Sequence, residues 1–211
     1  RAIASAITAL LTANAYRISA EIASVKGAFE RFEENKEPML HVMKQHRDAA
    51  YKLDVRYCPN YLLEATREEW DHVVELGEKY GYRNAQATVI APTGTIGLLM
   101  DCDTTGVEPE FSLIKWKKLA GGGYFKIINK SIEKALIKLG YDDLEIKEII
   151  EHIMENGNIE NALHMKKEHL AVFDCANQNL GGKRFIDPIG HVKMMAAVQP
   201  FVSGAISKTV N

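Results

Sequence analysis

The sequence has little cysteine, no long apolar run and almost no excess of charge. Its three cysteines, Cys58, Cys102 and Cys175, are far apart and none belongs to a C-x-x-C pair, which argues against a disulfide framework or a structural zinc site. No stretch of about 18 or more apolar residues is present, so no membrane-spanning helix is expected. The net charge of −2 predicts no broad cationic surface for nucleic acid or for an anionic membrane.

Several motifs of catalysis and metal binding are also missing. The seven histidines form no H-E-x-x-H, and no Walker A loop is present. Asp101, Asp103 and Glu108 lack the spacing of a calcium-binding EF-hand loop. No metal site is therefore expected. No signal peptide is visible, and the cytoplasm is the expected compartment.

The composition is that of a globular protein, with 211 residues, of which 46% are hydrophobic and 26% charged. The chain starts at Arg1 inside a helical pattern, and residues 203–211 resemble a strand with no tail after it. Both ends are therefore interpreted as cut from a longer sequence.

Residues 1–83 are predicted to be mainly helical. One long amphipathic helix is expected to end near Gly27, and a second to run from Pro38 to about Tyr51. A third is expected to begin at a capping box of Thr66 and Glu69. The apolar residues at helical spacing are Ile3, Ile7, Leu10, Leu11, Ile18, Ile22 and Val25 in the first helix, and Trp70, Val73, Val74 and Tyr80 in the third, which stops at Gly81.

Residues 84–211 have a different character. Gln86–Ala91 is short, apolar and partly β-branched, which predicts a buried strand, and Gly204–Val210 predicts a last strand. Three helices are expected between them. The first has a buried face of Ile128, Ile132, Ala135, Leu136 and Leu139 and stops at Gly140. The second is capped by Asp142 with Glu145 and ends at Gly157, and the third begins at Asp187 and Pro188. Tyr124 and Phe125 could stack on a ring, but core positions at a helix start are favoured. Strands alternating with helices indicate the α/β class, and the excess of helices fits a fragment of a larger barrel or layered sheet.

The most informative segment is A-P-T-G-T-I, Ala91–Ile96, between the predicted strand and a possible short helix. Free backbone N–H groups and the positive end of a helix would meet there. Gly94 allows close approach of a ligand, Thr93 and Thr95 add hydroxyl groups, and no carboxylate lies between residues 84 and 100. The pattern suits a phosphate or diphosphate. A plain strand-to-helix turn explains the same residues.

Two other segments leave alternatives open. In residues 100–110, Glu108 could be a buried, hydrogen-bonded carboxylate, and Cys102 could be a reactive or simply a buried thiol. The run from Lys115 to Lys118 contains Trp116 and could contact nucleic acid, but a solvated face is favoured.

Four long motifs resemble the adenosylcobalamin-dependent, class II ribonucleotide reductases. They are N-A-Q-A-T-V-I-A-P-T-G-T-I-G-L-L-M-D-C-D-T-T-G-V-E-P-E-F (84–111), K-L-A-G-G-G-Y-F-K-I-I-N (118–129), H-L-A-V-F-D-C-A-N (169–177) and H-V-K-M-M-A-A-V-Q-P-F-V-S-G-A-I-S-K-T-V-N (191–211). The resemblance implies a ten-stranded α/β barrel that reduces ribonucleotides, with diphosphates favoured, by a cobalamin-generated thiyl radical. It also implies a thioredoxin-type reductant. Within that pattern Pro92, Thr93, Gly94, Thr95 and Ile96 contact the substrate phosphates, with Ala91 as a neighbour.

The chain departs from the family pattern in its cysteines. The radical-cysteine motif, of the Asn-x-Cys-x-Glu type, is absent from the sequence, as is the C-terminal cysteine tail. No catalytic residue is therefore assigned. Residues 1–211 are interpreted as one C-terminal portion of the catalytic barrel, in which 84–211 supply the substrate-phosphate loop, helices and a closing strand. The remaining N-terminal part is the expected partner. The alternative is a non-catalytic nucleotide- or cobalamin-binding remnant, or one half of a split enzyme.

Overall fold

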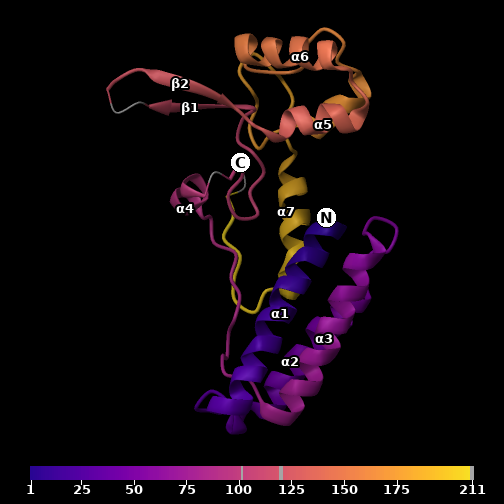
Figure 1. Cartoon of the computed structure of the whole chain (residues 1–211), viewed down its shortest axis with the longest axis vertical. Coiled ribbons are helices and arrows are strands. Elements are labelled where there is room, and N and C mark those ends of the chain that lie inside the picture. The colour runs from indigo at the N-terminus through magenta and orange to yellow at the C-terminus, as the bar shows by residue number, and fades with distance from the viewer. Residues whose placement is uncertain (101, 119–120, 210–211) are drawn as a thin grey trace. The chain divides into compact units, whose positions relative to one another are not determined.

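A computed structural model describes residues 1–100, 102–118 and 121–209. The chain divides into two compact units. Unit 1 comprises Arg1–Ala91 with Val192–Lys208, and unit 2 comprises Pro92–His191 with Thr209 onwards. The boundary near the C-terminus lies inside helix α7 (Pro188–Val198) (Figure 1).

Unit 1 is built from α1 (Ala2–Lys26), α2 (Lys36–Tyr51) and α3 (Asn60–Tyr80), with short 3₁₀ helices η1 (Glu33–Asn35) and η3 (Gln199–Phe201). Figure 1 shows α1 and α3 side by side, and these two helices share the most extensive contact. The predicted end of the first helix at Gly27 is confirmed. The capping box at Thr66 is wrong, because α3 already begins after Pro59. Thr66 is buried inside the helix, and its hydroxyl donates to the carbonyl of Leu62 at 2.6 Å.

The two faces of α1 differ in the size of their side chains. The face toward the core carries alanine, serine and threonine together with Tyr16. The large apolar residues that define the helix in the sequence lie on the other face, and Ile7 and Leu11 are more than half exposed. The exposed members of this outer stripe are Ile3, Ile7, Leu11, Ile18, Ile22 and Val25. The small residues let α3 approach closely, and the outer stripe has no cover within unit 1.

The large side chains in the unit 1 core come from α3 and its flanks. Trp70 and Val73 are fully buried, as the sequence predicts. Tyr82 is also fully buried, and its hydroxyl donates to the carbonyl of Val73 at 2.9 Å. Tyr82 packs edge-on against Tyr16, with ring centroids 5.5 Å apart. Gly77 makes room for Tyr82, because a Cβ at Gly77 would lie 1.9 Å from the Tyr82 hydroxyl oxygen.

The predicted strands at 86–91 and 204–210 are wrong as strands. A single parallel bridge joins Ile90 to Ile206, with N–H to carbonyl distances of 3.0 and 2.9 Å. Val89 is 65% exposed, so the segment is not buried either. A buried parallel strand needs partners on both sides, and the described residues provide one. The end of the last predicted strand, Val210, lies outside the described residues.

Unit 2 contains α4 (Gly94–Leu99), an antiparallel hairpin of β1 (Ile114–Lys118) and β2 (Tyr124–Ile128), α5 (Ser131–Leu139), α6 (Asp143–Asn156) and η2 (Lys167–Phe173). The hairpin corrects the predicted helix start, since Tyr124 and Phe125 lie on β2 and are more than half exposed. The last predicted helix is confirmed by α7, where Asp187 caps Ile189 N–H at 2.9 Å.

The predicted buried face of α5 is confirmed at Ile132 and Leu136, whereas Ile128, predicted on the same helix, lies on β2. Ile132, Leu136, Ile146, Ile149 and Ile153 form much of the unit 2 core. The helix signals are also confirmed: Gly140 and Gly157 adopt the left-handed conformation, and Asp142 and Glu145 form both hydrogen bonds of a capping box, at 2.9 and 3.0 Å.

The described residues are rich in helices and hold one two-stranded sheet and one isolated bridge. The ten-stranded barrel and the single-portion domain assignment stay predictions. Among these residues no helix is long and apolar enough to cross a lipid bilayer.

Each unit encloses one free cysteine. Cys58 is buried in the core of unit 1 and Cys175 in the core of unit 2, whereas Cys102 is exposed. Burial raises the pKa of Cys58, and burial raises the pKa of Cys175 to about 11. The exposure of Cys102 excludes the buried-thiol interpretation of that residue.

Candidate functional site: the loop before α4

The A-P-T-G-T-I segment leads into α4. Ala91 is the last residue of the N-terminal part of unit 1, and Pro92–Ile96 belong to unit 2. The first intrahelical bond runs from Gly97 N–H to the carbonyl of Thr93 at 2.7 Å. The N–H groups of residues 94–96 therefore occupy the first turn, where helical partners are lacking. Gly94, Thr95 and Ile96 are exposed, so this turn can be reached from solvent.

Thr93 adopts an unusual backbone conformation at the start of the loop. Its φ is +51°, in the left-handed region that β-branched residues rarely occupy. Such a conformation costs on the order of 1–3 kcal/mol and persists only where surrounding contacts hold it. The contact here is a hydrogen bond from Gly106 N–H to the Thr93 hydroxyl oxygen, at 2.7 Å. The hydroxyl keeps its own proton available for a ligand.

The turn that supplies Gly106 packs against α4. Cys102 N–H donates to the Gly97 carbonyl at 2.9 Å, and a Cβ at Gly97 would lie 3.1 Å from the methyl group of Thr105. Glu108 is half-buried and accepts a hydrogen bond from Thr209 N–H at 2.8 Å. Asp101, considered with Glu108 in the sequence, lies outside the described residues.

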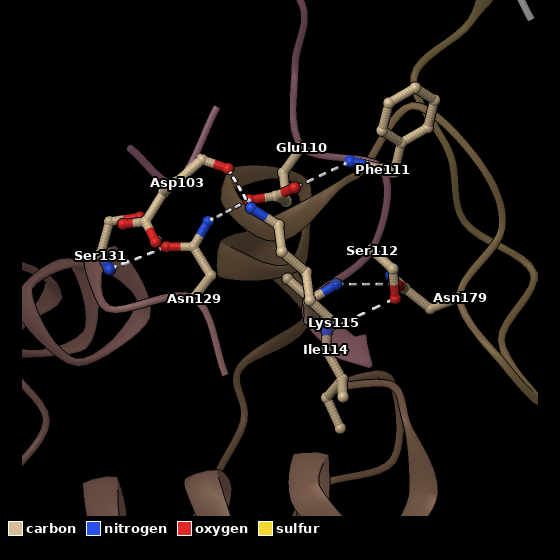
Figure 2. Close-up of polar contacts among 10 residues, drawn as sticks. Asp103, Glu110, Phe111, Ser112, Ile114, Lys115, Asn129, Ser131 and Asn179 are labelled. Carbon is tan, nitrogen blue, oxygen red and sulfur yellow. Dashed lines mark hydrogen bonds and ion pairs between the residues drawn. The ribbon is translucent and has the colours of Figure 1, made fainter. Parts of the chain in front are cut away.

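The more deeply buried carboxylate of this region is Glu110, whose side chain is 11% exposed (Figure 2). One oxygen is 3.0 Å from Lys115 Nζ and accepts a hydrogen bond from the Asn129 side-chain amide at 2.9 Å. The other oxygen accepts from Phe111 N–H at 3.2 Å. Lys115 Nζ also donates to the backbone carbonyl of Asp103. The ion pair therefore joins β1 to the turn that contacts the loop.

Asn129 connects this ion pair to the end of the hairpin. It is buried, its N–H donates to the Leu113 carbonyl at 3.1 Å, and its side-chain oxygen accepts from Ser131 N–H at 2.8 Å. On the other side, Leu113 N–H donates to the Asn179 side chain at 3.1 Å. Every polar group of the buried Glu110 side chain thus has a partner, as burial requires.

Comparison with known proteins identifies the family. The family model for the ribonucleotide reductase barrel domain matches residues 1–211. The chain belongs to the ribonucleotide reductase barrel-domain family.

Curated relatives extend this match. Proteins named vitamin B12-dependent ribonucleotide reductase from Rhodopirellula baltica and Streptantibioticus cattleyicolor are 54% and 52% identical to the whole chain, which covers 20% and 35% of their lengths. A protein from Thermoplasma acidophilum named vitamin B12-dependent ribonucleoside-diphosphate reductase is 32% identical over 61% of this chain and 15% of its own length. The chain therefore spans about a fifth to a third of the first two relatives.

Nothing described in this reductase barrel chain forms a recognisable cobalamin or metal site. Among the described residues, no group of three or more His, Cys, Asp or Glu side chains could hold a metal ion. The hollow of about 1080 Å³ in unit 1 is open to solvent, has Lys52, Arg56 and Lys193 on its walls, and has no histidine in its lining. Neither observation identifies a cobalamin site among the described residues, so no step is assigned through the cofactor.

Sequence reasoning missed Glu110, Lys115 and Asn129. The basic run at 115–118 suggested a solvated face or a nucleic-acid contact, but strand alternation turns neighbouring side chains to opposite sides. Lys115 is directed toward Glu110, while Trp116 is 61% exposed, with Lys126 Nζ 5.0 Å from its ring centroid. A hairpin prediction for 114–128 would have distinguished Lys115, which faces Glu110, from the exposed Trp116.

Proposed function

We propose that this chain supplies the substrate-phosphate loop of a vitamin B12-dependent ribonucleotide reductase. The observation that carries the proposal is the exposed first turn of α4, residues 94–96, directly after a Thr93 fixed in the left-handed conformation. Backbone N–H groups at this position attract the oxygens of a phosphate. The names of the relatives support the reaction and its B12 dependence.

The proposed substrate is a ribonucleoside diphosphate. Thr95 and the first-turn N–H groups of Gly94 and Ile96 would hold the terminal phosphates, with Thr93 donating its hydroxyl proton and Pro92 and Ala91 setting the entry of the chain. Fixing the diphosphate orients the ribose toward the reacting thiol, which is the positioning part of catalysis. The name of the Thermoplasma relative supports a diphosphate.

The overall reaction exchanges the ribose 2′-hydroxyl for hydrogen. A dithiol gives two electrons and two protons, becomes a disulfide, and the hydroxyl leaves as water. The B12 dependence named for the relatives supports adenosylcobalamin as the cofactor of the full-length enzyme. A thioredoxin-type reductant would then return the disulfide to the dithiol state.

The cysteines of this chain do not suit the radical role. Cys58 and Cys175 are buried with raised pKa values, and Cys102 is not placed between Asn and Glu as in the family motif. We therefore assign the radical cysteine to the remaining part of the full-length reductase. The uncovered apolar stripe of α1 supports such a partner, because exposed apolar surface of this kind marks an interface.

The test is the Thr93→Val/Thr95→Val double variant in the full-length reductase. We expect Kd for cytidine diphosphate to rise about tenfold, equivalent to about 1.4 kcal/mol. Thr104→Val is the matched control, because Thr104 is exposed in the neighbouring turn. Calorimetric binding and steady-state reduction are measured together. Unchanged Kd and KM in the double variant would contradict the assignment, and binding without reduction in the unaltered protein would favour the non-catalytic alternative.

A further inference from the structure

We propose that Lys115 is a positioning residue for the phosphate loop. By holding the Asp103 carbonyl against the buried Glu110, it fixes the turn whose Gly106 N–H keeps Thr93 in the left-handed conformation. This inference rests on the proposed function of the loop. It adds a role for an ion pair that touches neither Thr93 nor the exposed first turn of α4.

Lys115 lies between two fixed groups. Its side chain is 34% exposed, and Nζ contacts both the Glu110 carboxylate, at 3.0 Å, and the Asp103 carbonyl oxygen (Figure 2). Glu110 is itself held by Asn129 at 2.9 Å and by its own backbone, whose carbonyl accepts from Ala176 N–H at 2.7 Å. The ammonium group therefore ties Asp103 to an anchored carboxylate.

The short turn after Asp103 connects this contact to the loop. Two residues separate Asp103 from Gly106, which has φ of +55° and donates to the Thr93 hydroxyl oxygen at 2.7 Å. The Glu108 N–H to Thr105 carbonyl bond, at 3.0 Å, closes the turn behind it. A turn this short passes a displacement at Asp103 directly to Gly106. Without that hydrogen bond, the Thr93 side chain loses its contact with the turn, and the bond from Gly97 N–H to the Thr93 carbonyl remains.

A second lysine of the same hairpin distinguishes a positioning role from a general contribution to folding. Lys126, on the paired strand β2, also holds a backbone carbonyl, that of Met154, at 2.8 Å. Its contact with Met154 lies on α6 and does not involve the turn at 103–106. The two lysines thus make similar contacts from one hairpin, and only Lys115 contacts the turn.

The experiment measures binding of cytidine diphosphate and inorganic pyrophosphate by calorimetry in the full-length reductase. We expect Lys115→Met to raise both Kd values about tenfold, equivalent to about 1.4 kcal/mol. Lys126→Met should leave them within about twofold, and Lys115→Arg should recover most of the binding, since arginine can make the same contacts. Equal losses in Lys115→Met and Lys126→Met would overturn the proposal.

A second variant separates loop position from an unpaired charge. Lys115→Met leaves Glu110 buried without a cation, which destabilises a protein by itself. In Lys115→Met/Glu110→Gln both charges are gone, so the midpoint of thermal unfolding should recover while Kd stays raised. Recovery of Kd together with the midpoint would show a purely structural role and overturn the proposal.

A double-mutant cycle with Thr93→Val tests whether Lys115 affects binding through Thr93. Because Lys115 is proposed to act through the Thr93 hydroxyl, Lys115→Met should weaken binding by less than about threefold in a Thr93→Val background. Independent, additive losses would contradict that route. If neither Thr93→Val nor Thr95→Val changes Kd, the proposed function fails and the inference fails with it. If Thr93→Val weakens binding and Lys115→Met does not, only the inference on Lys115 fails.

Discussion

Helix α1 of unit 1 and helix α6 of unit 2 differ in whether their isoleucines face solvent or the core of their own unit. In α6, Ile149 and Ile153 are fully buried and form the core. In α1, Ile7 and Ile18 are exposed, and the core side is made of alanine and other small residues. The apolar spacing of both sequences is helical. Periodicity therefore identifies which residues share a face, but the size of the neighbours decides which face is covered within the chain.

This contrast predicts that α6 is more sensitive than α1 to the loss of its isoleucines. Ile149→Ala removes a fully buried side chain from α6 and should lower the free energy of unfolding by about 2–5 kcal/mol. Urea unfolding followed by circular dichroism measures the change. Leu144→Ala, on the same helix and 64% exposed, is the control. Equal effects of the two substitutions would show that α6 is not packed as described.

Unit 1 should instead be sensitive to added atoms. Gly77→Ala normally favours a helix, but here the new methyl group meets the buried Tyr82 hydroxyl. We expect a loss of about 1–3 kcal/mol, measured as a lower urea midpoint in the fluorescence of the buried Trp70. The control is Gly121→Ala, where a Cβ meets open space. A gain in stability for Gly77→Ala would refute the close packing.

Acid should weaken unit 1 through His46. Burial lowers the pKa of His46 below its usual 6.5, although its contact with the Pro200 carbonyl opposes this. The unfolded chain therefore binds a proton more readily, so stability is complete above about pH 6.5 and falls as the pH drops below it. Thermal unfolding of the wild type and of His46→Gln between pH 7.5 and 5.0 tests the sign. A smaller acid-induced loss is expected in the variant, and an identical loss would exclude His46 as the cause.

The smallest effect is expected on the outer face of α1. Ile7→Thr and Ile18→Thr keep the branched shape and change exposed residues, so each should alter the stability of this chain by at most about 0.5 kcal/mol. In the full-length reductase the same changes should cost more, because the proposed partner covers this stripe. The same small effect in both proteins would argue against an interface there.

Local signals in the sequence were reliable where one short segment determines the structure. The capping box of Asp142 and Glu145, the glycine stops at 140 and 157, and the end of α1 at Gly27 all require only neighbouring residues. One local signal failed, the capping box at Thr66, because α3 already begins after Pro59. The other failures involved distant partners. Residues 86–91 need strands on both sides to become buried, and the hairpin at 114–128 depends on pairing across a glycine turn.

The candidate site also has one part that local sequence predicts and one part that depends on distant partners. The loop at 92–96 could be found from its own residues, because glycine, threonine and a following helix are adjacent in sequence. The ion pair of Glu110 and Lys115 could not be predicted from neighbouring residues. Its contacts are with Asn129, Asp103 and Ala176, which folding brings together. The predicted phosphate contacts remain a prediction until binding is measured.

The two buried thiols give each unit an internal reporter of its own opening. An alkylating reagent reacts with thiolate, so Cys58 and Cys175 should stay unmodified while the core around each is closed, and the exposed Cys102 should react at once. Mass spectrometry after brief pulses of reagent at rising urea would then record two labelling curves from one sample. Coincident labelling curves would mean that the two units unfold in one cooperative transition. Separated curves would give the order in which the two units unfold.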